Sequence, residues 1–89
     1  MGKVTATPEI TCFPNPTQGV LNIRLAETLP HNFKIIVCNC TGAIVFENCS
    51  KSGQFEKTIP LFDLSTGVYK LFLTDENGLF IQSVSFLKN

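Results

Sequence analysis

The 89-residue chain has no tryptophan, a single histidine, a single tyrosine and no excess of either charge. Seven lysine and arginine residues balance seven aspartate and glutamate residues. Binding to nucleic acid requires a basic surface, and peripheral membrane binding requires a polybasic segment, so the neutral balance argues against both. No apolar run approaches the roughly 18 residues of a membrane span. The sequence therefore indicates one small domain that neither binds nucleic acid nor inserts into a membrane.

Catalytic and cofactor motifs are also missing. The sequence contains no G-x-S-x-G nucleophile turn and no glycine-rich phosphate loop. His31 lies in a Pro-His-Asn turn, where we expect an exposed turn residue rather than a base or a ligand. Asp75–Gly78 lacks the further oxygen ligands of a calcium loop, so we expect a hairpin tip there. We predict a non-enzymatic domain with no cofactor and no metal.

The four cysteines allow two interpretations. Cys38 and Cys40 form a C-x-C pair rather than the C-x-x-C of zinc and redox sites. A disulfide from Cys12 or Cys49 to this segment is one possibility. The other is that the cysteines are small apolar packing residues.

Hydrophobic residues alternate with polar ones along nearly the whole chain. Tyr69, Leu71 and Leu73, for example, fall on one face of a strand. Turn signals containing glycine or proline separate these runs at intervals typical of a sandwich or barrel. The expected strands are 9–13, 20–25, 33–38, 43–48, 54–59, 67–74 and 79–87. In the last of them, one face is expected to carry Phe80, Gln82, Val84 and Phe86.

Individual turn residues suggest local geometry. Pro14 and Pro16 lack backbone donors, so we expect them to stop strand pairing. Positive φ angles are expected at Gly42, Gly67 and Gly78.

Three motifs occur in a fixed order. P-N-P-T-x-G at residues 14–19 precedes an alternating strand, N-x-x-G follows at 39–42, and L-x-x-G-V-Y at 64–69 leads into another strand. In this order they resemble the C-terminal sorting domain of cargo proteins of the type IX (Por) secretion system of Bacteroidetes. Asn39 stands where the family usually has aspartate, and asparagine can still cap the turn through its side chain.

The resemblance implies a seven-stranded, immunoglobulin-like antiparallel β-sandwich over residues 10–89, with residues 1–9 as a lead-in or linker. It also implies that the domain follows an N-terminal passenger in the same precursor. Such a domain directs its cargo from the periplasm across the outer membrane to the cell surface or the medium. Its expected partners are the type IX translocon and a sortase-like peptidase that removes it.

The residues that match the family motifs are the candidates for recognition. They are Pro14, Asn15, Pro16, Gly19, Gly67, Tyr69, Phe86 and Lys88. We expect the terminal strand to be an edge strand, which offers a template for pairing with a receptor. One alternative is a fibronectin-like accessory or carbohydrate-binding module of a secreted enzyme, for which Phe72 is the outward aromatic residue. Another is a free-standing cytoplasmic β protein.

Overall fold

A computed structural model describes residues 9–26, 31–53 and 56–89, and within these ranges the chain forms strands and no helix. Accordingly, the described residues contain no helix that could cross a membrane. The strands are β1 (Ile10–Phe13), β2 (Val20–Leu25), β3 (Phe33–Cys38), β4 (Ile44–Ser50), β5 (Glu56–Pro60), β6 (Gly67–Asp75) and β7 (Phe80–Lys88).

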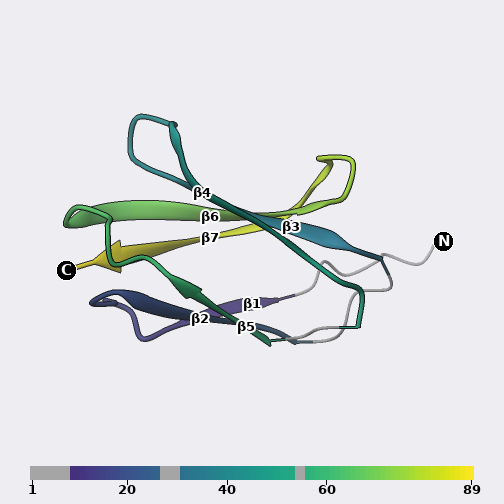
Figure 1. The fold of residues 1–89 in the computed structure, drawn as a ribbon, viewed down its shortest axis with the longest axis horizontal. Helices are drawn as coiled ribbons and strands as arrows, with labels where there is room; N and C mark the ends of the chain where they lie inside the picture. Colours follow the sequence, from purple (N-terminus) through teal and green to yellow (C-terminus); the bar gives the residue numbers. More distant parts are fainter. Residues whose placement is uncertain (1–8, 27–30, 54–55) are drawn as a thin grey trace, which may run out of the picture.

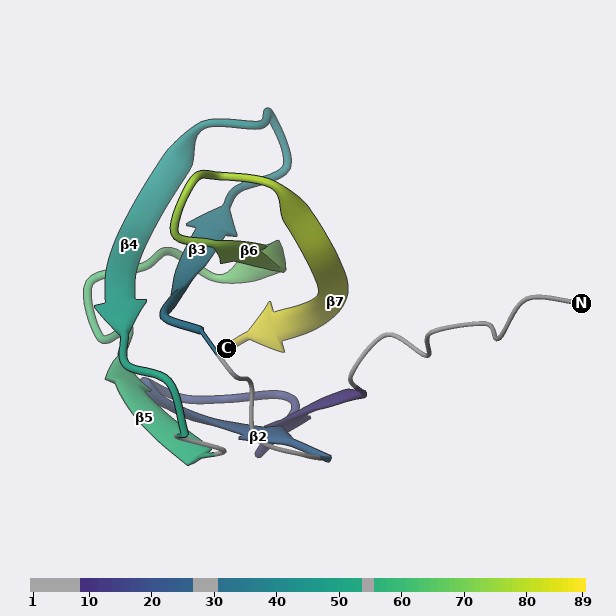
Figure 2. The same ribbon diagram turned by 90° about the vertical axis from the view of Figure 1, so that its right-hand side faces the viewer.

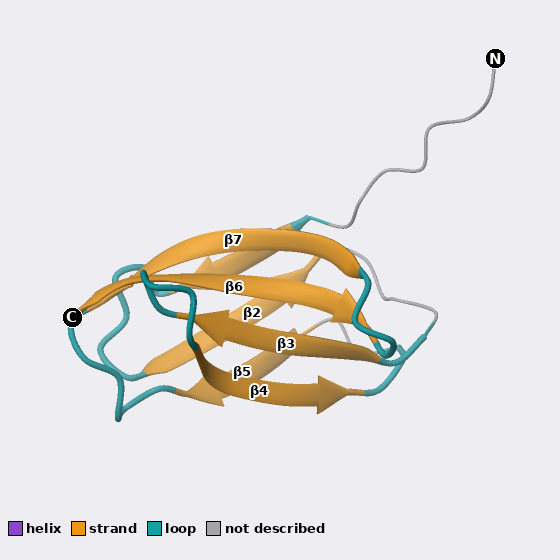
Figure 3. Ribbon diagram, turned by 90° about the horizontal axis from the view of Figure 1, so that it is seen from above, coloured by secondary structure: helices purple, strands orange, loops and turns teal. Residues whose placement is uncertain are grey.

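The strands form two antiparallel sheets that pack face to face (Figures 1 and 2). One sheet has three strands in the order β1-β2-β5, and the other has four in the order β4-β3-β6-β7. Figure 3 shows the four-stranded sheet lying across the three-stranded one. The predicted seven-stranded antiparallel sandwich is therefore confirmed, and β7 is an edge strand as expected.

The core lies between the two sheets and is built by alternating residues of both. Tyr69, Leu71 and Leu73 of β6 all point inward, as their spacing predicts. Burial of these apolar side chains is the main stabilising term for a sandwich of this size. The remaining buried apolar residues are Leu21, Ile23, Leu25, Phe33, Ile35, Val37, Ile59, Leu61 and Phe86.

A β-bulge overturns the expectation for Phe80. Leu73 pairs with Gln82, but the next pair along the two strands is Thr74 with Phe80, so Ile81 is an extra residue on β7. Because strand side chains alternate between faces, one extra residue at 81 places Phe80 on the face opposite to the one that two-residue periodicity predicts. Phe80 is consequently 61% exposed, while Ile81 packs against the core.

The turns agree with the sequence at most positions. Gly42 and Gly78 have φ angles of 90° and 92°, as predicted. Gly67 does not, because it is the first residue of β6 and pairs with Lys88 in extended conformation. The Asn39 side chain accepts hydrogen bonds from the backbone N–H groups of Thr41 and Ala43, both at 3.0 Å, so it caps its turn.

Parts of three expected features fall outside the described residues. The start of the predicted strand 54–59 lies there, and β5 is described from residue 56. Pro30 of the expected Pro-His-Asn turn lies there as well, as do residues 1–8 of the expected lead-in. His31, at the edge of this gap, is exposed in a bend as expected.

Candidate functional site

Motif residues of the β1–β2 loop and of the last two strands lie together at one end of the sandwich. This end contains the loop between β1 and β2, the start of β6 and the end of β7 (Figure 1). Thr17 of the loop forms a parallel bridge with Lys88, and Gly67 of β6 pairs with Lys88 from the other side. Segments some 70 residues apart in sequence therefore form a single structural unit.

Three hydrogen bonds attach the β1–β2 loop to the end of β7, and we call them the terminal clamp. The Leu87 N–H donates to the Asn15 side-chain oxygen at 2.9 Å. The Thr17 N–H donates to the Leu87 carbonyl, and the Asn89 N–H donates to the Thr17 carbonyl, both at 2.9 Å. Asn15 and Thr17 thus occupy the outer edge of β7 at its C-terminal end.

Thr17 also organises its own turn. Its side chain is fully buried, and its hydroxyl donates to the Val20 carbonyl at 2.5 Å. The same oxygen accepts the Gly19 N–H at 3.2 Å. Thr17 lies within the P-N-P-T-x-G motif but is not among the recognition candidates predicted from the sequence. Its signal was present, since threonine hydroxyls often bond to backbone groups in turns.

Gly19 leaves room for the ring of Phe62. A Cβ atom at residue 19 would lie 2.5 Å from Cε1 of Phe62, well inside van der Waals contact. The Gly19 carbonyl also accepts the Leu61 N–H at 2.5 Å, which ties the loop to the segment after β5. Phe62 is 66% exposed although it is a large apolar residue, and the sequence analysis did not identify it.

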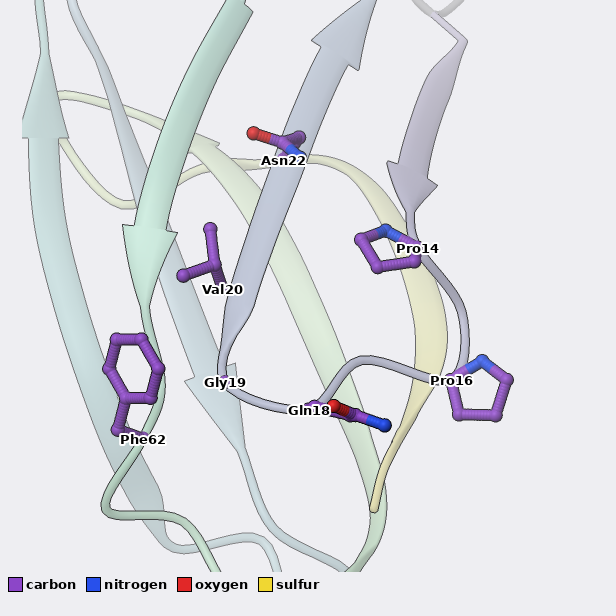
Figure 4. A pocket seen from close by; sticks show the side chains of 7 residues that line it. All are labelled: Pro14, Pro16, Gln18, Gly19, Val20, Asn22 and Phe62. Atoms are coloured by element: carbon purple, nitrogen blue, oxygen red, sulfur yellow. The ribbon is translucent and has the colours of Figure 1, made fainter.

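A shallow, mostly apolar groove lies beside this contact. In Figure 4 the Phe62 and Val20 side chains lie on one side of the groove, and Pro14 and Pro16 lie on the other. Its lining contains no charged side chain and is completed by Gln18, Gly19 and Asn22. The exposed part of the P-N-P-T-x-G motif therefore forms a neutral surface.

Tyr69 and Phe86 join β6 to β7 beneath the clamp. Their rings stack with centroids 5.7 Å apart and an interplanar angle of 20°. The Tyr69 hydroxyl donates to the Ser65 carbonyl at 2.7 Å, which satisfies the polar group that burial of this residue requires. Both side chains are buried, so their role in this structure is to shape the end of the sandwich.

Lys88 is buried as well, with only 6% of its surface exposed. Its ammonium group donates to the main-chain oxygen of Asn89 at 2.8 Å. The candidates thus separate by exposure. Pro14, Asn15 and Pro16 are exposed, Gly67 is half-buried, and Gly19, Tyr69, Phe86 and Lys88 are buried.

The cysteines form no disulfide, since all four lie in the described ranges as free thiols. Cys12 packs against the core, as the packing interpretation predicts, and its burial raises its pKa to about 11. Cys40 and Cys49 are free and exposed, so they are neither disulfide-bonded nor buried packing residues. Within the described ranges, no three or more His, Cys, Asp or Glu side chains are grouped so that they could hold a metal ion.

Comparison with known proteins supports both the fold and the motifs. A family model described as "secretion system C-terminal sorting domain" matches residues 11–85. The chain is also similar to the crystal structure of a DUF3244 family protein with an immunoglobulin-like β-sandwich fold from Bacteroides vulgatus ATCC 8482. That similarity has a TM-score of 0.68 and 24% sequence identity, and it covers 90% of this chain and 84% of the other.

The structural similarity confirms the predicted immunoglobulin-like fold. Comparison with curated proteins gives no match. The family model spans most of the chain, and it includes the P-N-P-T-x-G, N-x-x-G and L-x-x-G-V-Y motifs that the sequence analysis singled out. The chain therefore belongs to the secretion system C-terminal sorting domain family.

Proposed function

We propose that this domain is a non-catalytic sorting signal that takes a passenger protein across the outer membrane by type IX secretion. Membership of the family implies a secreted cargo protein that the type IX system handles. In the proposal, the passenger lies N-terminal to the domain and the precursor passes through the periplasm. The translocon recognises the folded domain, and a sortase-like peptidase removes it during export.

The observation that carries the proposal is the convergence of the motif residues on the end of β7. The clamp, the Tyr69–Phe86 stack and the Gly67–Lys88 pairing all fix the terminal strand in place. A domain without catalytic motifs, whose motif residues mainly fix one edge strand, is suited to presenting that strand.

We assign different roles to the exposed and buried candidates. Pro14, Asn15 and Pro16 are available for contact with the export machinery because their side chains lie on the surface. The buried candidates set the position of that surface. Gly19 does so by accommodating Phe62, and Lys88 does so by pairing with Thr17 and Gly67.

Export of a reporter protein tests the proposal. A reporter with a periplasmic signal peptide is fused to residues 4–89 and expressed in a host with an active type IX system. We expect it on the cell surface or in the medium, and we expect a fusion lacking residues 86–89 to stay in the periplasm. Equal export of the two fusions would contradict a role for the terminal strand.

One observation favours the alternative of a carbohydrate-binding module. Phe72 and Phe80 form an edge-to-face pair on the outer face of the four-stranded sheet, with centroids 6.3 Å apart and an interplanar angle of 70°. Phe72 is half-buried, however, so the pair offers no flat aromatic platform. Glycan-array binding that is lost in Phe72→Ala, together with normal export of that variant, would support this alternative.

A further inference from the structure

Residues of the β1–β2 loop occupy one end of the outer edge of β7, and among the described residues no strand pairs with the middle of that edge. In an antiparallel ladder, the backbone groups of alternate residues point away from the neighbouring strand. Both backbone groups of Leu87 point away from β6, because they are bonded to Asn15 and Thr17. The same alternation directs the backbone groups of Ser85 and Ser83 outward from the sheet.

The Ser85 backbone groups have no hydrogen-bond partner in the described part of the chain. At Ser83, the N–H is bonded to the Gln82 side-chain oxygen at 3.0 Å, and the carbonyl has no partner among the described residues. Among the described residues, this edge therefore offers the carbonyl groups of Ser83 and Ser85 as acceptors and the Ser85 N–H as a donor. The Ser83 N–H is bonded to the neighbouring Gln82 side chain. Exposed polar groups of this kind favour pairing with an added strand.

A groove lies beside the Ser83 part of this edge. The edges of β1 and β7 lie side by side, and Figure 2 shows them on the same side of the sandwich. Among the described residues, β1 pairs only with β2, so it does not cover the β7 edge. The groove between them is lined by Glu9, Ile10, Thr11, Gln82, Ser83 and Val84.

We propose that the Ser83–Ser85 edge of β7 binds an extended polypeptide segment of the export machinery, which adds as a strand in the groove beside β1. The identity of this partner rests on the proposed sorting function. The terminal clamp limits the added strand, because Asn15 and Thr17 already occupy the backbone groups of Leu87.

The groove also defines the chemistry of the segment. Val84 and Ile10 are half-buried and face inward, whereas the Ser85 side chain is exposed. An added strand places alternate side chains inward and outward. The segment that fits therefore has small or branched apolar residues facing Val84 and Ile10, and polar residues facing solvent. Main-chain hydrogen bonds supply most of its attachment, as in other cases of strand addition.

Proline at residue 85 tests this edge selectively. The Ser85 N–H points away from β6, so Ser85→Pro removes no bond of the β6–β7 ladder and is compatible with an edge strand. It does remove the free donor, and its ring blocks a neighbouring strand. Ser85→Ala is the matched control because it keeps the N–H. We expect Ser85→Pro to reduce export of the residue 4–89 reporter fusion at least about tenfold, and Ser85→Ala to leave export unchanged.

The melting temperature and circular dichroism of both variants show whether they are folded. If Ser85→Pro is unfolded, Ser83→Pro takes its place, since that change removes only the bond to the Gln82 side chain. Export at the wild-type level by a folded proline variant would overturn the proposal. Retention of the wild-type fusion in the periplasm would instead contradict the sorting function, and with it the assigned partner.

Amide hydrogen exchange of the 89-residue chain tests the edge without export. We expect the Ser85 amide to exchange quickly, because none of the described residues accepts a hydrogen bond from it, and the Leu87 amide to exchange slowly, because its N–H is bonded to Asn15. A protected Ser85 amide, or a dimer that forms through β7, would show that the edge is already occupied. Either result would overturn the proposal.

Discussion

At the residue scale, the site depends on a few side chains whose partners are far away in sequence. Thr17 joins the loop to the last residues of the chain, and Phe62 lies over Gly19. The motif around Thr17 and Gly19 could be read from the sequence because its turn chemistry is local. Phe62 could not, because nothing near it in sequence indicates that it covers the backbone of a loop some forty residues earlier.

The close approach of Gly19 and Phe62 predicts a measurable coupling. Gly19→Ala forces the Phe62 ring aside, so we expect it to lower the free energy of unfolding by about 1–3 kcal/mol. In a Phe62→Ala background, Gly19→Ala should lower the free energy of unfolding by less than about 0.5 kcal/mol, because the obstructing ring is absent. Urea denaturation of the four proteins in this double-mutant cycle measures the difference. An equal cost in both backgrounds would show that the ring does not restrict residue 19.

Burial of Cys12 predicts slow thiol chemistry. The folded protein holds the Cys12 pKa at about 11, above the value of 9.0 for an exposed thiol. The thiolate fraction at a given pH near 8 is therefore about 100-fold lower than for an ordinary cysteine. We expect iodoacetamide to modify exposed Cys40 and Cys49 first and Cys12 last, as followed by mass spectrometry. Equal rates at the three sites would contradict the burial of Cys12.

The same pKa shift sets the direction of a pH effect. Because the folded pKa is above the unfolded one, the neutral thiol is favoured in the folded state. Its contribution to stability is fully present below the unfolded pKa and is lost as the pH rises through the interval up to about 11. Cys12→Ala should reduce the loss of stability in this alkaline interval.

At the element scale, two-residue periodicity was a sufficient guide to the strands but not to local irregularities. It predicted the inward residues of β6 correctly and misplaced Phe80, because the extra residue Ile81 leaves the hydrophobic pattern unbroken. It also could not distinguish a glycine that begins a strand from one that forms a turn. Gly67 belongs to the first kind and Gly78 to the second.

The contrast between these two glycines gives a direct stability test. Gly78 has a φ angle of 92°, which L-residues rarely adopt, so Gly78→Ala should cost about 1–2 kcal/mol. A Cβ at Gly67 would lie 4.0 Å from Tyr69 Cε1, an ordinary contact. Gly67→Ala should therefore change stability by no more than about 0.5 kcal/mol. Urea denaturation compares the variants, and a larger loss at Gly67 would contradict the strand assignment at that residue.

At the scale of the whole molecule, the fold brings the β1–β2 loop against the end of β7. The order of the motifs predicted the family and the sandwich, but it could not show that Asn15 and Thr17 bond to Leu87 and Asn89. Such contacts depend on how the sheets pack, which local patterns do not specify. The structure also shows that Lys88 is buried, although a terminal lysine suggests an exposed charge.

We propose that this domain acts as a type IX sorting signal, and that function can be measured directly. It is tested most directly by the extracellular fraction of a reporter fused to residues 4–89. The fraction is measured in a type IX-competent strain and in an otherwise identical strain lacking the translocon. We expect the reporter to reach the surface or medium of the competent strain and to stay in the periplasm of the other. Equal extracellular fractions in the two strains would contradict it.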